Sequence, residues 1–443
     1  MKRSINATAL YFISVALLPS YGLGQSVSQP SSAYIDQTRG TGIDDLVALA
    51  FRENADLLAT RQQLTEAQGL LRQSSFRPNP AIDVSYGDGA PVGSGKNLRE
   101  VSLGYSHTFE LGGKRQRRIE VSEWGLKLAE TEIADRERQI RAEVKSRYGE
   151  ALAAVRNLQF TEQLLELNRE TLQITQARVQ EGESPAVDQG LLQVDLGRLE
   201  SDRTLVENQV LRNVLAIKPL VGMPLEQSLP LQGDLRTWQP KITLPEALAK
   251  GAEARPDLAA TRLDQSLRDA QVRSAKAEAV PNVVGSVRFT RSNDLFDQLG
   301  VTRSGVPVPI RDLDKMLTAG VSITLPTRNR NQGNIQAAEA RTTSARLRNQ
   351  YLEQVVAQEI TSAYRRFEAA QRSRSIFESA VLDRSQDNLR IIRAAYSAGE
   401  LRLFDVLNEQ RRLVDTQRAY TEVLREYFLS VVELERAVGA SLP

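Results

Sequence analysis

The chain has no cysteine, one histidine and three methionines among its 443 residues, and aromatic side chains make up only 5% of it. Without cysteine it cannot form disulfides or thiolate metal sites, and it has neither a cysteine nucleophile nor a cysteine for an N-terminal lipid anchor. A single histidine also leaves out most catalytic triads and histidine-based metal centres. The composition therefore predicts neither an enzyme nor a protein with a bound metal or cofactor.

The sequence also lacks a dominant charge and a long apolar run. Its 57 lysines and arginines nearly balance its 55 aspartates and glutamates, so it has no broad basic surface for nucleic acid. Beyond the N-terminus, no stretch reaches the ~20 apolar residues that a membrane-spanning helix requires. Nucleic acid is therefore not expected as a partner, and no helix is expected to span a membrane.

The first 25 residues resemble a secretory signal peptide. Lys2 and Arg3 precede an apolar stretch over 7–18, and small residues at 22–24 form a candidate cleavage site. The alternative is an N-terminal membrane anchor, for which the apolar stretch is short. We therefore expect an exported chain in which residues 26–41 form a flexible leader.

The rest of the chain consists of two similar sequence repeats. Residues 43–60 align without a gap on residues 244–261, residues 104–119 on 320–335, and residues 181–188 on 398–405. The offset changes only between these blocks, where the loops differ in length, which indicates that one unit was duplicated whole. We expect a first repeat over 42–225, a linker over 226–242 and a second repeat over 243–443.

Each repeat contains two segments of alternating apolar and polar residues, at 81–88 and 100–111 and at 282–291 and 317–325. The last is the most regular, with Leu317, Val321 and Leu325 on one face and Thr318 and Ser322 on the other. Strands of about ten residues with an apolar outside and a polar inside are typical of an outer-membrane β-barrel. The alternative is two hairpins of an ordinary soluble protein.

Four strands are too few to close a barrel, and an open sheet edge in lipid leaves backbone groups without hydrogen bonds. Two copies would supply eight strands, whose bore is filled by side chains, whereas three copies would supply twelve and leave an open lumen. The sequence therefore predicts a homotrimer embedded in outer-membrane lipid.

The remaining segments are helical. Residues 115–180 and 330–397 contain no proline, and apolar residues such as Val356, Ile360 and Ala363 recur at steps of three and four. At 1.5 Å per residue, each segment would form a helix ~100 Å long. Shorter helices are expected beside them over 44–76, 186–217, 245–279 and 402–438. Such helices would wall a tube that extends far beyond the membrane.

Two local motifs carry a resemblance to a known family. Arg77 to Pro80 (RPNP) precede the first strand, and Phe109 to Arg115 (FELGGKR) connect the second strand to the long helix. Residues 42–443 resemble the outer-membrane factors of tripartite efflux pumps and type I secretion systems, the TolC-like channels, and in particular their heavy-metal efflux branch, the CzcC and CusC type. The resemblance implies a mainly α fold with a membrane β segment: a trimeric twelve-stranded β-barrel continued by a twelve-helix periplasmic α-barrel.

The resemblance also implies a gate at the periplasmic turns. Gly399 to Leu407 (GELRLFDVL) match the family's turn into the returning helix, and Gly182 to Asp188 match it less closely. By this resemblance, Asp405 and Asp188 would form rings of negative charge that attract cations. The alternative is that both aspartates only cap the starts of helices.

Three further positions are assigned by the same resemblance. Tyr396 matches a tyrosine that helps to hold the gate closed, Arg402 lies one position later than the gate arginine of the family, and Asn408 stands in place of a second aspartate. The turns that contain Gly182 and Gly399 would dock a periplasmic adaptor, the membrane fusion protein.

The function expected from these features is a passive outer-membrane channel with a periplasmic extension. It would export heavy-metal cations delivered by an inner-membrane RND-type pump. A multidrug or type I protein-secretion channel of the same architecture is the first alternative. A periplasmic coiled-coil adaptor without a pore is the second.

Overall fold

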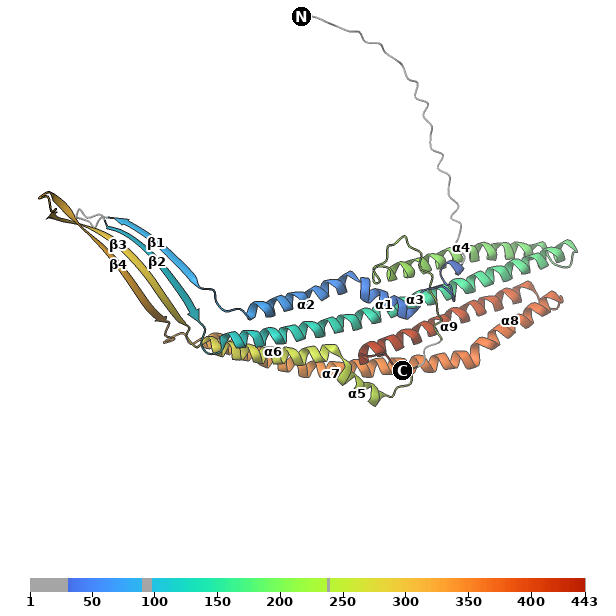
Figure 1. Ribbon diagram of the computed structural model, residues 1–443. Coiled ribbons are helices and arrows are strands. Elements are labelled where there is room, and N and C mark those ends of the chain that lie inside the picture. The colour runs from blue at the N-terminus through green and yellow to red at the C-terminus, as the bar shows by residue number, and fades with distance from the viewer. Residues whose placement is uncertain (1–30, 90–97, 237–239, 443) are drawn as a thin grey trace, which may run out of the picture.

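The computed structural model describes residues 31–89, 98–236 and 240–442 of the chain. The expected signal peptide, residues 1–25, lies outside these ranges. A curved sheet occupies one end of the molecule, and a bundle of long helices extends from it to two turns at the opposite end (Figure 1). The sheet and the helix turns are thus the two extremes of one rod.

The sheet has four antiparallel strands in the order β1-β2-β3-β4. Their bounds are β1 (Ala81–Gly89), β2 (Leu98–Phe109), β3 (Val283–Val301) and β4 (Pro307–Ile323). The pairing of β2 with β3 joins the two halves of the chain. Within the described chain, β1 and β4 form the two edges of the sheet.

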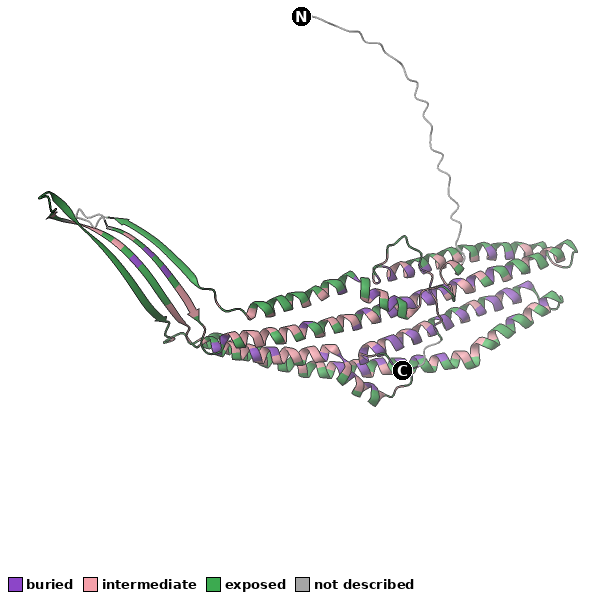
Figure 2. Cartoon of the chain, viewed as in Figure 1, coloured by how far each residue is buried: buried purple, intermediate pink, exposed green. Residues whose placement is uncertain are grey.

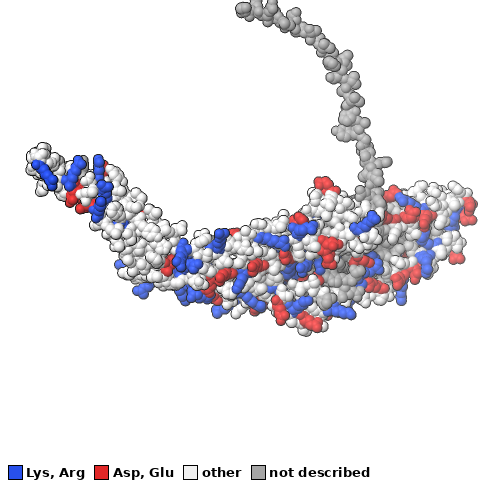
Figure 3. All heavy atoms as spheres, in the orientation of Figure 1, with Lys and Arg blue, Asp and Glu red and all other residues white. Residues whose placement is uncertain are grey.

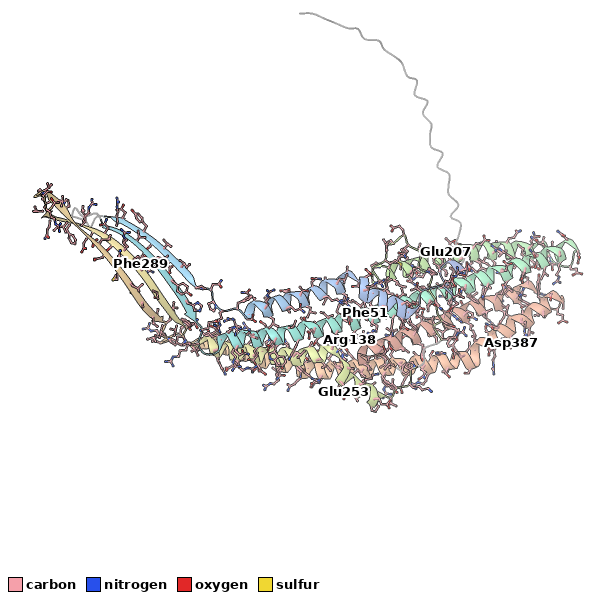
Figure 4. The ribbon with its side chains drawn as sticks, viewed as in Figure 1. Phe51, Arg138, Glu207, Glu253, Phe289 and Asp387 are labelled. Carbon is pink, nitrogen blue, oxygen red and sulfur yellow. The ribbon has the colours of Figure 1, made fainter. Side chains whose placement is uncertain are left out.

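The register places apolar residues in rows on one face of the sheet. Val84, Leu103, Phe289 and Leu317 pair in that order across the four strands, and their side chains are 74%, 54%, 43% and 73% exposed. Figure 2 shows the strands largely exposed, with most of the buried residues on the helices, and Figure 4 labels Phe289 on the sheet. The apolar face therefore has no protein cover in a single chain.

The opposite face of the sheet is polar and partly covered. Ser102 is 1% exposed, its Oγ lies 2.7 Å from Ser85 Oγ, and Arg288 Nη1 donates to it at 2.9 Å. A soluble antiparallel sheet buries its apolar face and exposes its polar one. This sheet is inverted in that sense, which confirms the alternation predicted from the sequence.

The second hairpin is longer than predicted. The sequence predicts strands over 282–291 and 317–325, but β3 continues to Val301 and β4 begins at Pro307, with an irregularity in the pairing between Leu295 and Leu299. Residues 307–316, which include prolines and charged side chains, have a sequence typical of a loop. They extend the hairpin because pairing uses backbone groups, and both faces of an exposed ribbon can carry polar side chains.

The described residues form nine α-helices and one π-helical turn. The first half contains α1 (Ile43–Glu53), α2 (Ala55–Ser74), α3 (Lys114–Gln180) and α4 (Ala186–Ile217). The second half contains α5 (Leu244–Ala254), α6 (Pro256–Glu278), α7 (Gln332–Ile376), the π-helical turn η2 (Phe377–Val381), α8 (Leu382–Ser397) and α9 (Leu403–Val438). Among the described residues, no helix combines the length and apolar composition needed to cross a membrane.

The helices expected over 44–76 and 245–279 are each broken once, at Asn54 and at Arg255. Arg255 is extended because it precedes a proline, and Asn54 accepts the Leu57 N–H at 2.9 Å as a helix cap. Each residue also donates a hydrogen bond to a backbone carbonyl where its half of the chain ends. Asn54 Nδ2 donates to Leu220 O, just after α4, at 2.8 Å, and Arg255 Nη1 donates to Ala437 O, in the last turn of α9, at 3.2 Å. The two halves thus use equivalent positions to fix the same joint.

The FELGGKR motif forms the joint between strand and long helix. Gly112 and Gly113 both have φ of +70°, and a Cβ at Gly112 would lie 2.7 Å from Val280. Glu110 pairs with Arg118, and this hydrogen bond lowers the pKa of the Glu110 carboxyl. Buried Lys114 donates to Asn282 at 2.8 Å. The motif therefore holds the helix at a fixed angle to the sheet.

The described part of the expected flexible leader is ordered. Leu231 N–H donates to Tyr34 O at 2.9 Å, and Thr41 N–H donates to Pro230 O at 2.8 Å. Tyr34 and Ile35 also pack against the main apolar core. These bonds and the burial offset the conformational entropy that a free segment would keep. Residues 31–41 are therefore a strap along the linker, and the rest of the leader lies outside the described residues.

Candidate gate at the helix turns

The two turns farthest from the sheet have the same backbone structure. Gly182, two residues after the end of α3, has φ of +77°, and Gly399, two residues after the end of α8, has φ of +83°. In each turn the following glutamate bonds back into the helix, Glu183 N–H to Arg178 O at 2.8 Å and Glu400 N–H to Ala395 O at 2.9 Å. This is the Schellman motif, whose left-handed residue favours glycine. The sequence match between the turns thus reflects one conformation used twice.

A small apolar cluster ties the two turns together. Its buried members come from α4, α8 and α9: Leu192, Tyr396, Leu403, Val406 and Leu407. Leu172 of α3 packs against it. The cluster is separate from the larger core near the middle of the rod. The helices of both halves therefore meet at the tip through only a few apolar side chains.

Tyr396 is the polar centre of this contact. It is 4% exposed, and its hydroxyl lies 2.8 Å from Thr175 Oγ1 on α3. Arg178 Nη1 donates to Tyr396 O at 2.7 Å, and the Arg178 guanidinium lies 5.1 Å from the tyrosine ring centroid. We call Thr175, Arg178 and Tyr396 the latch, because they bond α3 of the first half to α8 of the second.

Sequence reasoning missed Arg178. The resemblance assigns the gate arginine to Arg402, which the structure places at the start of α9 with an exposed side chain. Arg178 stands four residues before Gly182, where the second half has Ala395 four residues before Gly399. This difference between two otherwise matching turns was the available signal.

The two aspartates occupy the first turns of the returning helices, Asp188 in α4 and Asp405 in α9. Asp405 Oδ2 accepts the Arg402 N–H at 3.1 Å and so caps the start of α9. Both carboxylates are half-buried and lie where the helix dipole favours negative charge. A single chain supplies two such carboxylates to the tip, and a ring of them requires further copies.

The fold is shared with solved outer-membrane channels. CusC has a TM-score of 0.70 at 17% identity, over 96% of this chain and 100% of that one. CmeC of Campylobacter jejuni has a TM-score of 0.71 at 16% identity, over 90% of this chain and 86% of that one. The chain thus has the predicted TolC-like fold, mainly α-helical with a β segment.

Curated relatives point to the same branch. The cobalt-zinc-cadmium resistance protein CzcC of Cupriavidus metallidurans is 24% identical over 433 residues, which cover 96% of this chain and 98% of CzcC. The nickel and cobalt resistance protein CnrC of the same organism is 26% identical over 290 residues, 64% of this chain and 65% of CnrC. With CusC, these relatives confirm the resemblance to the heavy-metal branch. The family described as outer membrane efflux protein matches residues 46–223 and 248–440, and the chain therefore belongs to the outer membrane efflux protein family.

Proposed function

We propose that the chain is the outer-membrane channel of a tripartite efflux system. It conducts substrate passively from an inner-membrane RND-type pump and a periplasmic adaptor to the exterior. The observation that carries this proposal is the inverted sheet, whose apolar rows are exposed and whose polar rows are partly covered. Hydrocarbon is the environment in which such a face is stable. The export signal over 1–25 and the absence of a lipid anchor are part of the proposal.

The sheet edges support a homotrimer. In lipid, the unpaired backbone groups of β1 and β4 would each cost several kcal/mol. Pairing β1 of one copy with β4 of the next satisfies them, and three copies give a twelve-stranded barrel with an open lumen. In Figure 3 the middle of the sheet carries few charged side chains, whereas charges cover the helices and the far end of the sheet.

The helical borders support the same assembly. α2 and α4 run along one border of the rod, and α7 and α8 run along the other (Figure 1). Large apolar side chains are exposed on both, among them Val194 (73%) and Leu205 (66%) on α4, and Tyr351 (69%) and Ile391 (61%) on α7 and α8. Contact between neighbouring copies would cover them and close the helices into a tube.

The proposed cargo is heavy-metal cations, because the relatives CzcC and CnrC are named for resistance to such metals. Across the described ranges, no group of three or more histidine, aspartate and glutamate side chains is placed to hold a metal ion. Selectivity would then lie in the pump, and the chain would act as a conduit without catalytic chemistry.

The proposed gate consists of the latch and the aspartates. While Tyr396 and Arg178 bond α3 to α8, the tip stays narrow and Asp405 and Asp188 form its negative ring. An adaptor that docks on the turns at Gly182 and Gly399 would break these bonds and untwist the returning helices, which widens the ring.

Asp405→Asn separates the charge of the ring from the capping of the helix. Asparagine can still accept the Arg402 N–H, whereas alanine cannot. In planar bilayers, we expect Asp405→Asn to weaken the block by multivalent cations severalfold because three charges are lost. Asp405→Ala should weaken the block equally and should also lower the free energy of unfolding by about 1 kcal/mol, because the helix cap is lost. Block that is unchanged in both variants would remove Asp405 from the constriction.

Growth of a deletion strain tests the function itself. Loss of the gene should sensitise cells to at least one of zinc, cobalt, cadmium, nickel, copper and silver, and expression of the full chain should restore growth. Sensitivity only to antibiotics, or a defect only in secreted protein, would favour the multidrug or type I secretion channel instead.

A further inference from the structure

A cavity of about 590 Å³ lies between α3 and α8 over α9. Its described lining comes from residues 156–167 of α3, 386–393 of α8 and 413–421 of α9, with Arg236 from the linker. α9 packs against both α3 and α8, so the cavity lies within one chain. Its volume is that of a pocket for a drug-sized molecule. Neither the latch nor the two aspartates line it.

The lining is strongly basic. It contains Arg156, Arg236, Arg390 and Arg393, and no aspartate or glutamate is among its described residues. Three of these arginines have a carboxylate outside the lining, at N–O distances of 3.3, 2.8 and 3.6 Å: Asp234 for Arg236, Asp387 for Arg390 and Glu170 for Arg393. Figure 4 shows Asp387 on the border of the rod. The positive ends of these pairs therefore face the cavity.

Arg156 is one of two partly buried arginines in the lining, with Arg393, whereas Arg236 and Arg390 are exposed. The Arg156 guanidinium lies 5.3 Å from the centroid of the Tyr420 ring. Burial, and then the charge of Arg236, lower the pKa of Arg156, and the charge of Asp234 offsets part of this shift. A partly buried cation next to a second cation is stabilised when an anion enters the space between them. Arginine is suited to that role because its planar donors match the oxygens of carboxylate, sulfate or phosphate.

The rest of the lining is apolar or neutral. Phe160, Leu164 and Leu167 of α3 face the cavity with Leu389 of α8 and Leu413 of α9, and glutamines stand between them. An inorganic anion would leave this apolar surface in water. A molecule with an anionic head and an apolar body would use both parts of the lining.

We propose that this cavity is a binding site for an anionic amphiphile, a small molecule with a carboxylate, sulfate or phosphate head and an apolar body. The ligand would contact α3 of the first half and α8 of the second, since both line the cavity. It would therefore bridge the same two helices as the latch. Arg393, in the lining, is one turn of α8 away from Tyr396.

The full-length protein in lipid nanodiscs tests this site by equilibrium dialysis with 2-naphthoate and its neutral isostere 2-naphthamide. We expect saturable binding of one naphthoate per chain after subtraction of empty nanodiscs, and at least tenfold weaker binding of naphthamide. Arg156→Gln combined with Arg393→Gln should weaken naphthoate binding at least tenfold. Arg412→Gln is the control, because this α9 side chain is 79% exposed and lies outside the cavity.

Arg390→Gln keeps the test decisive if the double variant fails to fold. Its side chain is 79% exposed, so the change leaves the core intact, and naphthoate binding should weaken severalfold. Equal binding of naphthoate and naphthamide, or equal naphthoate binding by the wild type and every cavity variant, would overturn the proposal. A third result would also overturn it: an acidic helical peptide binds in a way that depends on Arg156, and naphthoate does not bind. The cavity would then be a docking site for protein.

Discussion

Replacing Arg178 by alanine is expected to raise the time-averaged conductance per channel in planar bilayers severalfold. The variant loses the bond from Arg178 Nη1 to Tyr396 O and the contact of the guanidinium with the tyrosine ring. A hydrogen bond from a charged donor contributes about 1.5–3 kcal/mol, and each 1.4 kcal/mol changes an equilibrium about tenfold. The closed tip should therefore lose at least about tenfold in population relative to the open one.

Two further variants test whether this increase comes from the latch. Tyr396→Phe removes only the bond to Thr175 and keeps the ring beneath Arg178, so its effect should be smaller, near 1 kcal/mol. Arg169→Ala changes an arginine on the same helix that is 53% exposed and pairs only with surface glutamates, and it should leave the conductance unchanged. Equal currents in the wild type, Arg178→Ala and Arg169→Ala would show that the latch does not hold the gate.

Val287→Arg is expected to prevent assembly in the outer membrane. Val287 lies in the middle of the apolar face of β3, between Tyr105 and Ala319, and an arginine on the lipid face costs about 2–4 kcal/mol near the bilayer centre. Three copies would triple this cost, to roughly 6–12 kcal/mol for the assembly. Heat-modifiable, trimeric protein in outer-membrane fractions should therefore fall below detection.

Ser286→Arg is the matched control. It introduces the same side chain one residue earlier on the same strand, but on the polar face that already carries Arg288. Near-normal amounts of assembled protein are expected for this variant. If both variants assemble equally well, the apolar face does not meet hydrocarbon.

The sequence predicted most of the fold because its patterns are periodic. Alternation identified the sheet and its apolar face, and helix α4 spans the predicted residues 186–217. The extension of β3 and β4 could not be predicted, because pairing there depends on backbone bonds and not on side-chain alternation. The breaks at Asn54 and Arg255 were missed although each has a local signal, a capping side chain at Asn54 and a proline directly after Arg255. Each of these residues is also bonded to a residue more than 160 positions away in the chain, which no local pattern indicates.

The candidate gate was only partly predictable. Tyr396, Asp188 and Asp405 were found through a resemblance in local sequence, and their roles in gating stay predictions. Arg178 belongs to the other half of the chain, so its contact with Tyr396 follows from the meeting of α3 and α8 at the tip and not from any local motif. The basic cavity could not be predicted from the sequence either, because its four arginines come from α3, the linker and α8.

Cysteine cross-linking tests the central claim most directly, since the chain contains no cysteine of its own. Val84→Cys on β1 would be combined in turn with Leu313→Cys, Leu317→Cys and Val321→Cys on β4 in the full-length protein in outer membranes. If three copies close one barrel, at least one pair should yield a covalent ladder that ends at three chains after denaturation. A ladder that ends at two, continues beyond three or never forms would contradict the shared trimeric wall.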